Sequence, residues 1–332
     1  MHITTILATF AKIFTMDTPE IPSKLVAQLA KLEEKYESMG QDVSSYLDGL
    51  LYANYLTYWD YIHLDTLLSL QNAKTDFPDE QIFITYHQIT ELYFKLILAE
   101  IQQISFHCAI TEDFFVARLK RMIRYVRHLV ASFDIMIEGM ELEQFLSFRM
   151  SLLPASGFQS AQFRSIEICS TDLRNLTAHT FHRQIDTHTT IEEMYYNLYW
   201  KQGATELGTG KKTLTLKQFE SKYSNRLIKL AHEYKECNIW RVYKYHFKTS
   251  DKIPPLLREF DALVNIDWCL AHYSSAVKYL QRTPETIAAT GGTNWQKYLP
   301  PRFQKQLFFP ELWNEQEKEE WGKHWVLQQI GQ

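Results

Sequence analysis

The sequence predicts an all-α protein, and three observations support this fold class. The 332 residues include only 11 glycines and 10 prolines, so few residues interrupt regular structure. Apolar residues recur at helical spacing, and no segment shows the convincing polar–apolar alternation of a half-buried strand. The low glycine content also argues against a β-sandwich, a propeller or a glycine-rich nucleotide fold. We therefore expect one all-helical domain over residues 24–332, after an N-terminal extension of residues 1–23.

The first half of the chain contains three predicted helices. Residues 24–40 carry apolar side chains at helical spacing, with charged residues on the other face. Residues 44–70 are rich in Tyr, Leu and Trp, and a polar loop follows them. Two acidic residues suit the positive N-terminal end of a long helix over residues 79–105. Residues 113–137 form the third predicted helix. Its apolar stripe comprises Phe114, Val116, Leu119, Ile123, Val126 and Val130.

The second half is predicted to contain more interruptions. Residues 140–175 begin as a helix that a Pro/Gly segment breaks at 153–157. Residues 190–201 and 214–247 are helical again, on either side of an exposed glycine-rich loop. A last long helix is expected at about residues 256–282, after two consecutive prolines. A Thr/Gly loop and an extended proline-rich tail complete the chain.

Charge and cysteine content exclude several classes of protein. The net charge of −4 gives no basic surface for nucleic acid. The four cysteines lie far apart without a CxxC motif, so we expect neither a zinc site nor disulfides, and a reducing, cytoplasmic location. No apolar run approaches the roughly 20 residues of a membrane span. Residues 1–15 resemble a signal peptide only faintly, and both Met1 and Met16 are candidate start residues.

The predicted helix over residues 79–105 carries the first candidate for chemistry, His87. Apolar residues occupy nearly every side of this helix, so we expect it to be buried. Phe83 lies one turn before His87 and shares its face. A histidine in such a helix is either a hydrogen-bonded core residue or a group that contacts a ligand, and the local sequence leaves both interpretations open.

The second candidate, His272, lies in the middle of the last long helix. Its neighbours Ala271, Ser275 and Ala276 are small, which leaves room for a large flat group to approach the helix. A neutral imidazole in this setting is suited to axial ligation of haem iron. A histidine with a purely structural role is the alternative.

An arginine and a glycine loop are the remaining candidates. Arg149 lies in an aromatic segment before a Pro/Gly break, and its planar fork suits a carboxylate, either of a ligand or of the protein itself. Thr290 and Gly291 begin a flexible loop that could close on a ligand or serve as a turn. The chain has no HExxH, GxSxG, P-loop or GxGxxG motif.

Four blocks of sequence carry a family resemblance. Residues 58–71 (YWDYIHLDTLLSLQ) are similar to the pattern YxxYLxLDxLLxxQ, and residues 79–95 (DEQIFITYHQITELYFK) to DExxFxxxHQxxELWFK. Residues 148–164 (FRMSLLPASGFQSAQFR) almost reproduce FR…PASGFQSxQFR. Residues 271–292 contain AH, KYL and TGG in the order of a proximal-histidine helix and its loop. In these blocks the chain resembles the tryptophan 2,3-dioxygenase family, haem enzymes that open the indole ring of L-tryptophan.

The resemblance implies an all-helical fold that encloses a b-type haem, and a role for each matching residue. His272 would be the proximal ligand of the haem iron, and His87 the distal histidine that hydrogen-bonds the indole N–H. Arg149 would bind the substrate carboxylate. The other pocket residues would be Phe83, Phe145, Tyr58, Tyr61, Ser156, Thr290 and Gly291. The family's subunits associate as tetramers, so a homo-oligomer is expected, with the two tyrosines reaching a neighbour's site.

The implied reaction inserts both atoms of O2 into the indole C2–C3 bond of L-tryptophan and yields N-formylkynurenine. The aromatic content of 14% is consistent with an apolar site for the indole ring. The residues before His272 are Trp268-Cys-Leu-Ala, without the Arg of the family's WRxxH pattern, and residues 165–255 do not resemble the family's central part. Two alternatives therefore stay open: a haem monooxygenase acting on a modified indole or another aromatic amino acid, and a non-catalytic haem or tryptophan sensor.

Overall fold

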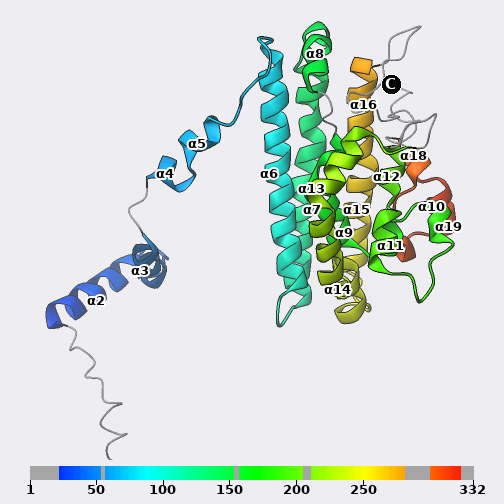
Figure 1. The fold of residues 1–332 in the computed structure, drawn as a ribbon. Coiled ribbons are helices and arrows are strands. Elements are labelled where there is room, and N and C mark those ends of the chain that lie inside the picture. Colours follow the sequence, from blue (N-terminus) through cyan, green and yellow to red (C-terminus); the bar gives the residue numbers. More distant parts are fainter. Residues whose placement is uncertain (1–21, 54–56, 153–156, 205–210, 281–299, 323–332) are drawn as a thin grey trace, which may run out of the picture. The chain divides into compact units, whose positions relative to one another are not determined.

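The structure, a computed structural model, describes residues 22–53, 57–152, 157–204, 211–280 and 300–322. The chain divides into two compact units, residues 1–70 and 71–332 (Figure 1). Regular structure among the described residues is helical, apart from one isolated bridge between Thr177 and Leu198, so the all-α prediction is confirmed. None of the described helices combines the length and apolar character needed to cross a membrane.

The described part of the N-terminal unit contains four helices and no buried residue. The helices are α2 (Ser23–Glu37), α3 (Val43–Tyr52), α4 (Tyr58–Tyr61) and α5 (Leu64–Leu68). The side chain of Asp42 caps α3 by accepting a hydrogen bond from the Ser44 amide at 3.0 Å. The rings of Tyr36 and Tyr46, 4.6 Å apart, connect α2 with α3. Residues 22–53 and 57–70 therefore form helices without a buried interior.

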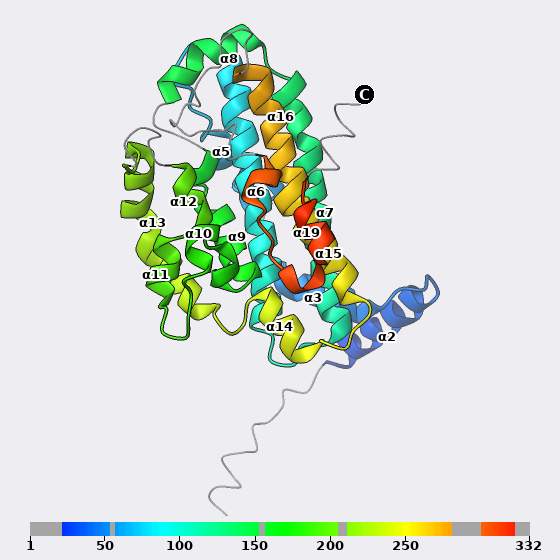
Figure 2. The same ribbon diagram turned by 90° about the vertical axis from the view of Figure 1, so that its right-hand side faces the viewer.

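Three long helical rods form the frame of the second unit, and two long helices are the first two of these rods. Helix α6 (Asp79–Ser105) has the bounds that the sequence predicts, and α7 (Glu112–Glu138) follows after a short turn. Figures 1 and 2 show α6, α7 and α16 side by side. The predicted stripe of α7 needs one correction, because Phe115 is fully buried whereas Phe114 is only half-buried. The buried face then continues through Leu129 to Phe133.

The third rod of the frame is continuous but changes helix type. Helix α15 (Ile253–Ala262) leads into a π-helical turn, η4 (Leu263–Asp267), and then into α16 (Trp268–Leu280). The prediction that this helix starts after the two prolines was wrong by a few residues. Both prolines lie in the first turn of α15, where a backbone N–H has no partner within the helix.

Shorter helices pack around the three rods. Two helices predicted as continuous, at residues 190–201 and 214–247, are each divided in two. The first breaks because the Asn197 carbonyl accepts a hydrogen bond from the Ala178 amide at 2.9 Å. The second predicted helix is divided at Asn238, which begins a new helix. The Asn238 side chain caps that helix by accepting a hydrogen bond from the Arg241 amide at 3.0 Å. The elements are α8 (Leu142–Phe148), η1 (Arg149–Leu152), η2 (Gly157–Gln159), α9 (Ala161–Ser170), η3 (Leu173–Leu176), α10 (His179–His182), α11 (Ile191–Tyr196), α12 (Tyr199–Gly203), α13 (Leu214–Glu233) and α14 (Ile239–His246).

The tail is not extended as predicted, because short helical turns shape its described part. These are α18 (Pro301–Gln304), η5 (Pro310–Leu312) and α19 (Glu315–Glu319). Asp261 on α15 fixes the tail, since its buried carboxylate accepts hydrogen bonds from the amides of Phe308 and Phe309 and from Trp313 Nε1, at 2.9–3.1 Å. The tail is thereby anchored to the third rod.

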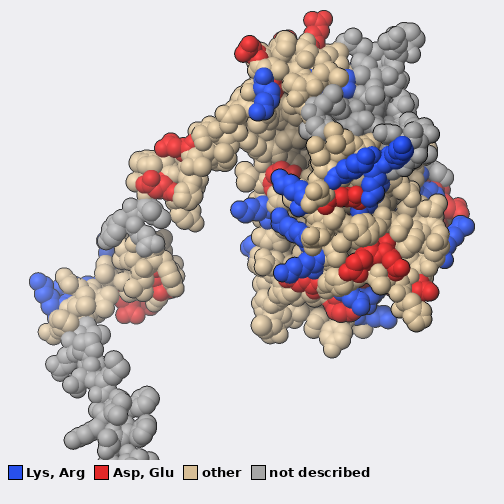
Figure 3. All heavy atoms as spheres, viewed as in Figure 1, with Lys and Arg blue, Asp and Glu red and all other residues tan. Residues whose placement is uncertain are grey.

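Two clusters of buried residues form the interior of the second unit. The larger one joins α6, α7, α9 and α13–α15. The smaller one lies where α6, α7, α8 and α16 meet, and contains Tyr86, Phe133, Phe148 and Tyr279. Acidic and basic side chains are interspersed on the visible face of this unit (Figure 3). The smaller cluster is the part of the fold that brings the predicted histidines together.

Candidate active site

His87 lies on α6 with its ring 4.2 Å from the ring of Phe83. Its Nδ1 is 2.7 Å from the Phe83 carbonyl oxygen. A carbonyl oxygen only accepts, so Nδ1 carries the proton, and Nε2 of the neutral ring is an acceptor. The surrounding protein lowers the pKa of His87 below its usual 6.5, because desolvation outweighs both this hydrogen bond and the charge of Glu91. His87 is therefore a neutral imidazole near pH 7.

His272 lies on α16, one turn after the residue that begins this helix, Trp268. Burial, together with a smaller effect of the nearby His87, lowers the pKa of His272 to about 4. The ring is thus neutral at physiological pH, the state in which imidazole nitrogen binds a metal. Its small neighbours Ala271 and Ala276 pack against the smaller cluster, and Ser275 is buried. His272 has the chemistry of an axial ligand for haem iron.

Two aromatic rings connect the two histidines. The ring of Tyr86 is 5.8 Å from His87 and 5.8 Å from Phe133, and the ring of Phe133 is 5.6 Å from His272. These residues come from α6, α7 and α16, three rods that pack together. The tertiary structure therefore places both predicted histidines at one aromatic cluster, although 185 positions separate them in the sequence.

Phe83 and Phe145, both predicted to line the pocket, also lie in this region. Their rings are 6.2 Å apart, and both contact Phe148, at 5.8 Å and 5.5 Å respectively. The ring of Phe145 is in addition 4.5 Å from that of Tyr279 on α16. Helix α8 thus covers the end of the cluster with aromatic side chains, which suit the flat apolar face of an aromatic ligand.

Arg149 follows Phe148 directly and begins the turn η1. Only 5% of its surface is exposed, and desolvation lowers the pKa of its guanidinium group from the usual value. A guanidinium group stays charged in proteins even so, and a buried cation is stabilised by an anion. Since Phe148 contacts both Phe83 and Phe145, Arg149 is attached to the aromatic cluster through its neighbour.

Glu80 fixes the start of α6 and with it the register of Phe83 and His87. Its side chain is fully buried and accepts hydrogen bonds from the amides of Lys74 and Thr75, each at 2.8 Å. Desolvation acts to raise the pKa of Glu80, but the hydrogen bonds from Thr75 and Lys74 outweigh it and hold the pKa below the usual 4.5. A charged Glu80 thus ties the preceding loop to the helix.

The remaining predicted site residues lie in the N-terminal unit or outside the described residues. Tyr58 and Tyr61 lie on α4 of the N-terminal unit, where they are 70% and 74% exposed. Ser156, Thr290 and Gly291 lie outside the described residues. Their predicted roles therefore stay predictions.

Sequence reasoning missed three residues that complete the cluster: Tyr86, Phe133 and Trp268. Phe133 and Trp268 have rings 4.8 Å apart, and Trp268 is 6.5 Å from His272. The periodicity of α7 could have found Phe133, because it lies seven residues after Val126 on the same stripe. Trp268 lies one turn before His272, and the same rule places both on one face of the helix.

Comparisons with known proteins establish the family. A family model described as tryptophan 2,3-dioxygenase matches residues 50–193. The tryptophan 2,3-dioxygenase of Herpetosiphon aurantiacus is 30% identical to this chain over 271 residues, which cover 78% of this chain and 96% of the relative. The chain belongs to the tryptophan 2,3-dioxygenase family.

Further relatives support the assignment to the tryptophan 2,3-dioxygenase family over different lengths. The enzyme of that name from Bacillus thuringiensis subsp. konkukian is 30% identical over 266 residues, 78% of this chain and 91% of the relative. One from an Anaeromyxobacter species is 42% identical over 113 residues, 34% of this chain and 42% of the relative. The range that the family model matches includes His87 and Arg149 and ends before His272.

Proposed function

We propose that this chain is a haem-dependent dioxygenase that inserts both atoms of O2 into the indole C2–C3 bond of L-tryptophan and yields N-formylkynurenine. Its membership of the tryptophan 2,3-dioxygenase family supports the reaction. The observation that carries the proposal is the placement of two neutral histidines, His87 and His272, at one aromatic cluster.

His272 holds the haem in this proposal. The donor fits, because its imidazole is neutral and its helical neighbours Ala271 and Ala276 are too small to obstruct a flat macrocycle. When bound, haem supplies the iron chemistry that activates O2. The residues of this chain then have to bind the substrate, orient it and exclude water.

His87 orients the indole ring. The Nδ1–H group of His87 donates a hydrogen bond to the Phe83 carbonyl oxygen. Nε2 can therefore only accept a hydrogen bond, and an indole N–H can only donate one. The two groups are complementary, and the hydrogen bond turns one edge of the indole toward α6. The low pKa keeps His87 from becoming a cation that would repel this donor.

Arg149 binds the carboxylate of the amino acid. The desolvated guanidinium forms a charge-assisted, bidentate pair more readily than an exposed arginine would, since water competes less. Phe83 and Phe145 pack on the indole face between the two polar anchors. Together the cation and the Nε2 acceptor define both ends of an L-tryptophan molecule.

Tyr58 and Tyr61 act in the site of a neighbouring copy in this proposal, within a homo-oligomer. The N-terminal unit exposes them with other large apolar residues, among them Leu50 and Leu51, so its helices have surface to place against another chain. Ser156 is assigned to the haem surroundings, and Thr290 and Gly291 to closure over the amino-acid end of the substrate.

The test of the function is the mass of the product. The haem-loaded, reduced protein is given L-tryptophan and ¹⁸O2, and the product should carry two labelled oxygen atoms. One labelled oxygen would instead indicate a monooxygenase. No product from haem-loaded protein would contradict the proposal.

A matched variant tests the substrate contacts in the same assay. Arg149→Ala should retain the haem spectrum of the parent, because the change leaves the proposed ligand His272 intact. Its KM for tryptophan should rise by about 100-fold, the loss of a buried charge-assisted pair. Tryptophan binding equal to that of the parent would show that Arg149 does not hold the carboxylate.

A further inference from the structure

The first turn of α9 joins the helix that carries His87 to the helix that carries His272. Ser160 begins this turn, because its side chain accepts a hydrogen bond from the Phe163 amide at 3.1 Å. The turn presents Gln162 and Phe163, two residues to which the proposed function assigns no role. Their side chains contact α6 and α16, the two helices of the candidate histidines.

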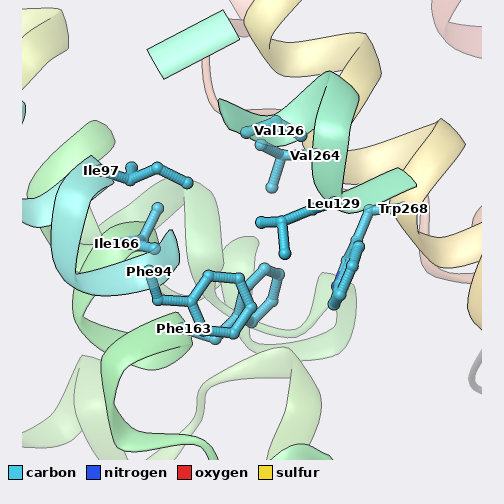
Figure 4. A pocket seen from close by; sticks show the side chains of 8 residues that line it. All are labelled: Phe94, Ile97, Val126, Leu129, Phe163, Ile166, Val264 and Trp268. Carbon is cyan, nitrogen blue, oxygen red and sulfur yellow. The ribbon is translucent and has the colours of Figure 1, made fainter. Parts of the chain in front are cut away.

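Phe163 makes the apolar contacts of this turn. Its ring is 5.4 Å from that of Phe94 on α6 and 6.4 Å from that of Trp268, the residue that begins α16. Figure 4 shows the three rings together with aliphatic side chains beside them. The guanidinium group of Arg164 lies 4.7 Å from the centre of the Phe163 ring and pairs with the buried Glu167 at 2.9 Å. These contacts orient the first turn of α9 against both helices.

Gln162 makes the polar contacts of the same turn. Its Nε2 donates to the main-chain carbonyl oxygen of Glu91 and to the carboxylate Oε2 of the same residue, both at 2.8 Å. Two hydrogen bonds from one amide group hold the half-buried side chain of Glu91 in one orientation. Within the described ranges, no lysine or arginine forms an ion pair with Glu91. Its partner is a neutral amide, so its negative charge is not cancelled.

The charge of Glu91 acts on His87. Glu91 lies four residues after His87 on α6, and residues with this spacing share a face of a helix. Desolvation lowers the pKa of His87, while the hydrogen bond to the Phe83 carbonyl and the charge of Glu91 both act in the opposite direction. A nearby anion makes an imidazole nitrogen more basic and therefore a stronger acceptor. The nitrogen that is free to accept is Nε2, because Nδ1 donates to Phe83.

We propose that Glu91 is a positioning residue for the reaction, whose carboxylate, held by Gln162, strengthens Nε2 of His87 as the acceptor of the indole N–H. The inference rests on the proposed function for the substrate and for the role of His87. Glu91 acts through His87 and not by contact with the substrate. Oxygen insertion draws electron density from the indole nitrogen, so the N–H becomes a stronger donor during the reaction. A strong acceptor then stabilises the reacting ring more than the bound substrate.

Two ligands isolate the hydrogen bond to the indole nitrogen. L-Tryptophan has the N–H group, and 1-methyl-L-tryptophan carries a methyl group in its place. Glu91→Gln removes the charge but keeps a side-chain oxygen that can accept from Gln162. In the haem-loaded protein, this variant should bind L-tryptophan about five-fold more weakly, because the acceptor is no longer assisted by a charge. Its Kd for 1-methyl-L-tryptophan should equal that of the parent.

A second variant and a matched control accompany this measurement. Gln162→Leu keeps the charge of Glu91 but releases its carboxylate, so it should weaken L-tryptophan binding by less than Glu91→Gln does. The control is Glu259→Gln, which neutralises a half-buried carboxylate on α15 that pairs with Arg127 on α7. It should bind both ligands as the parent does. The haem spectrum and the urea midpoint show that each variant folds.

A His87→Leu background shows whether Glu91 acts through His87. Without the imidazole, Glu91→Gln should change the Kd for L-tryptophan by less than about two-fold. An effect of equal size with and without His87 would overturn the positioning role, and so would equal effects on the two ligands. Either result is what a purely structural contact between α6 and α9 would give.

The proposed function and the positioning role fail in distinguishable ways. A parent that forms doubly labelled product, but whose Glu91→Gln variant binds L-tryptophan unchanged, would support the function and overturn the role of Glu91. A parent that forms no product, yet loses its preference for L-tryptophan over the 1-methyl compound in Glu91→Gln, would contradict the function. That result would still support the action of Glu91 on the contact between His87 and the indole N–H.

Discussion

The two units of the chain use similar helices with different results. In the N-terminal unit, Leu51 and Tyr52 on α3 are 80% and 83% exposed, and none of its described residues is buried. In the second unit, Phe115 and Leu119 on α7 are completely buried. Amphipathic periodicity is present in both, so local sequence is sufficient for a helix but not for a core. A core forms only where several apolar faces meet.

The difference bears directly on the candidate site. His87, Arg149 and His272 belong to the unit with a core, where packing against Phe133 and Phe148 fixes their surroundings. The tyrosines of the first sequence block belong to the N-terminal unit, in which no described residue is buried. Three predictions test whether stability is divided between the units in the same way.

The largest effect is expected from Asp261→Ala in the second unit. The change leaves two buried amides and the indole N–H of Trp313 without their acceptor, so the free energy of unfolding should fall by about 3 kcal/mol or more. Urea unfolding followed by tryptophan fluorescence measures it. The control Asp134→Ala, on the exposed side of α7, should change it by less than about 0.5 kcal/mol. Equal effects of the two variants would refute the anchoring role of Asp261.

A smaller, pH-dependent effect is expected from Glu80→Gln. The hydrogen bonds to its charged carboxylate are worth about 1–2 kcal/mol at pH 7, and the amide cannot accept all of them. Because the folded protein holds the pKa of Glu80 below 4.5, this contribution is complete above pH 4.5 and is lost as the pH falls through the folded value. The stability gap between parent and variant should therefore close on acidification.

Urea unfolding of both proteins between pH 7 and pH 3.5 checks this prediction. Glu143→Gln, at an exposed position of α8, is the control and should show no gap at any pH. A gap for Glu80→Gln that stays constant over this range would show that the charge of Glu80 does not stabilise the fold.

The smallest effect is expected from Leu50→Ser in the N-terminal unit. Leu50 is 71% exposed, so the unfolding free energy of dilute protein should change by less than about 0.5 kcal/mol. The matched change Leu227→Ser, at a fully buried position of α13, should cost about 3 kcal/mol or more. A large loss for Leu50→Ser that grows with protein concentration would show instead that another copy of the chain covers this residue.

Much of the fold could be predicted from local patterns. Helix α6 has the predicted bounds because an acidic start and the absence of Gly and Pro act within the segment itself. The breaks at Asn197 and Asn238 were missed, because each depends on a hydrogen bond that competes with the helix. The π-helical turn before His272 was also missed, because such turns are rare and the local sequence carries no signal for one.

The sequence by itself determined most of the helices and the family, and it supplied the candidate site residues, because these depend on residue type and on short-range spacing. The tertiary structure alone decided that His87 and His272 share an aromatic cluster through Tyr86 and Phe133, and that the imidazole of His272 has a pKa of about 4. Burial and desolvation are properties of side chains from distant segments brought together, and no single segment contains them.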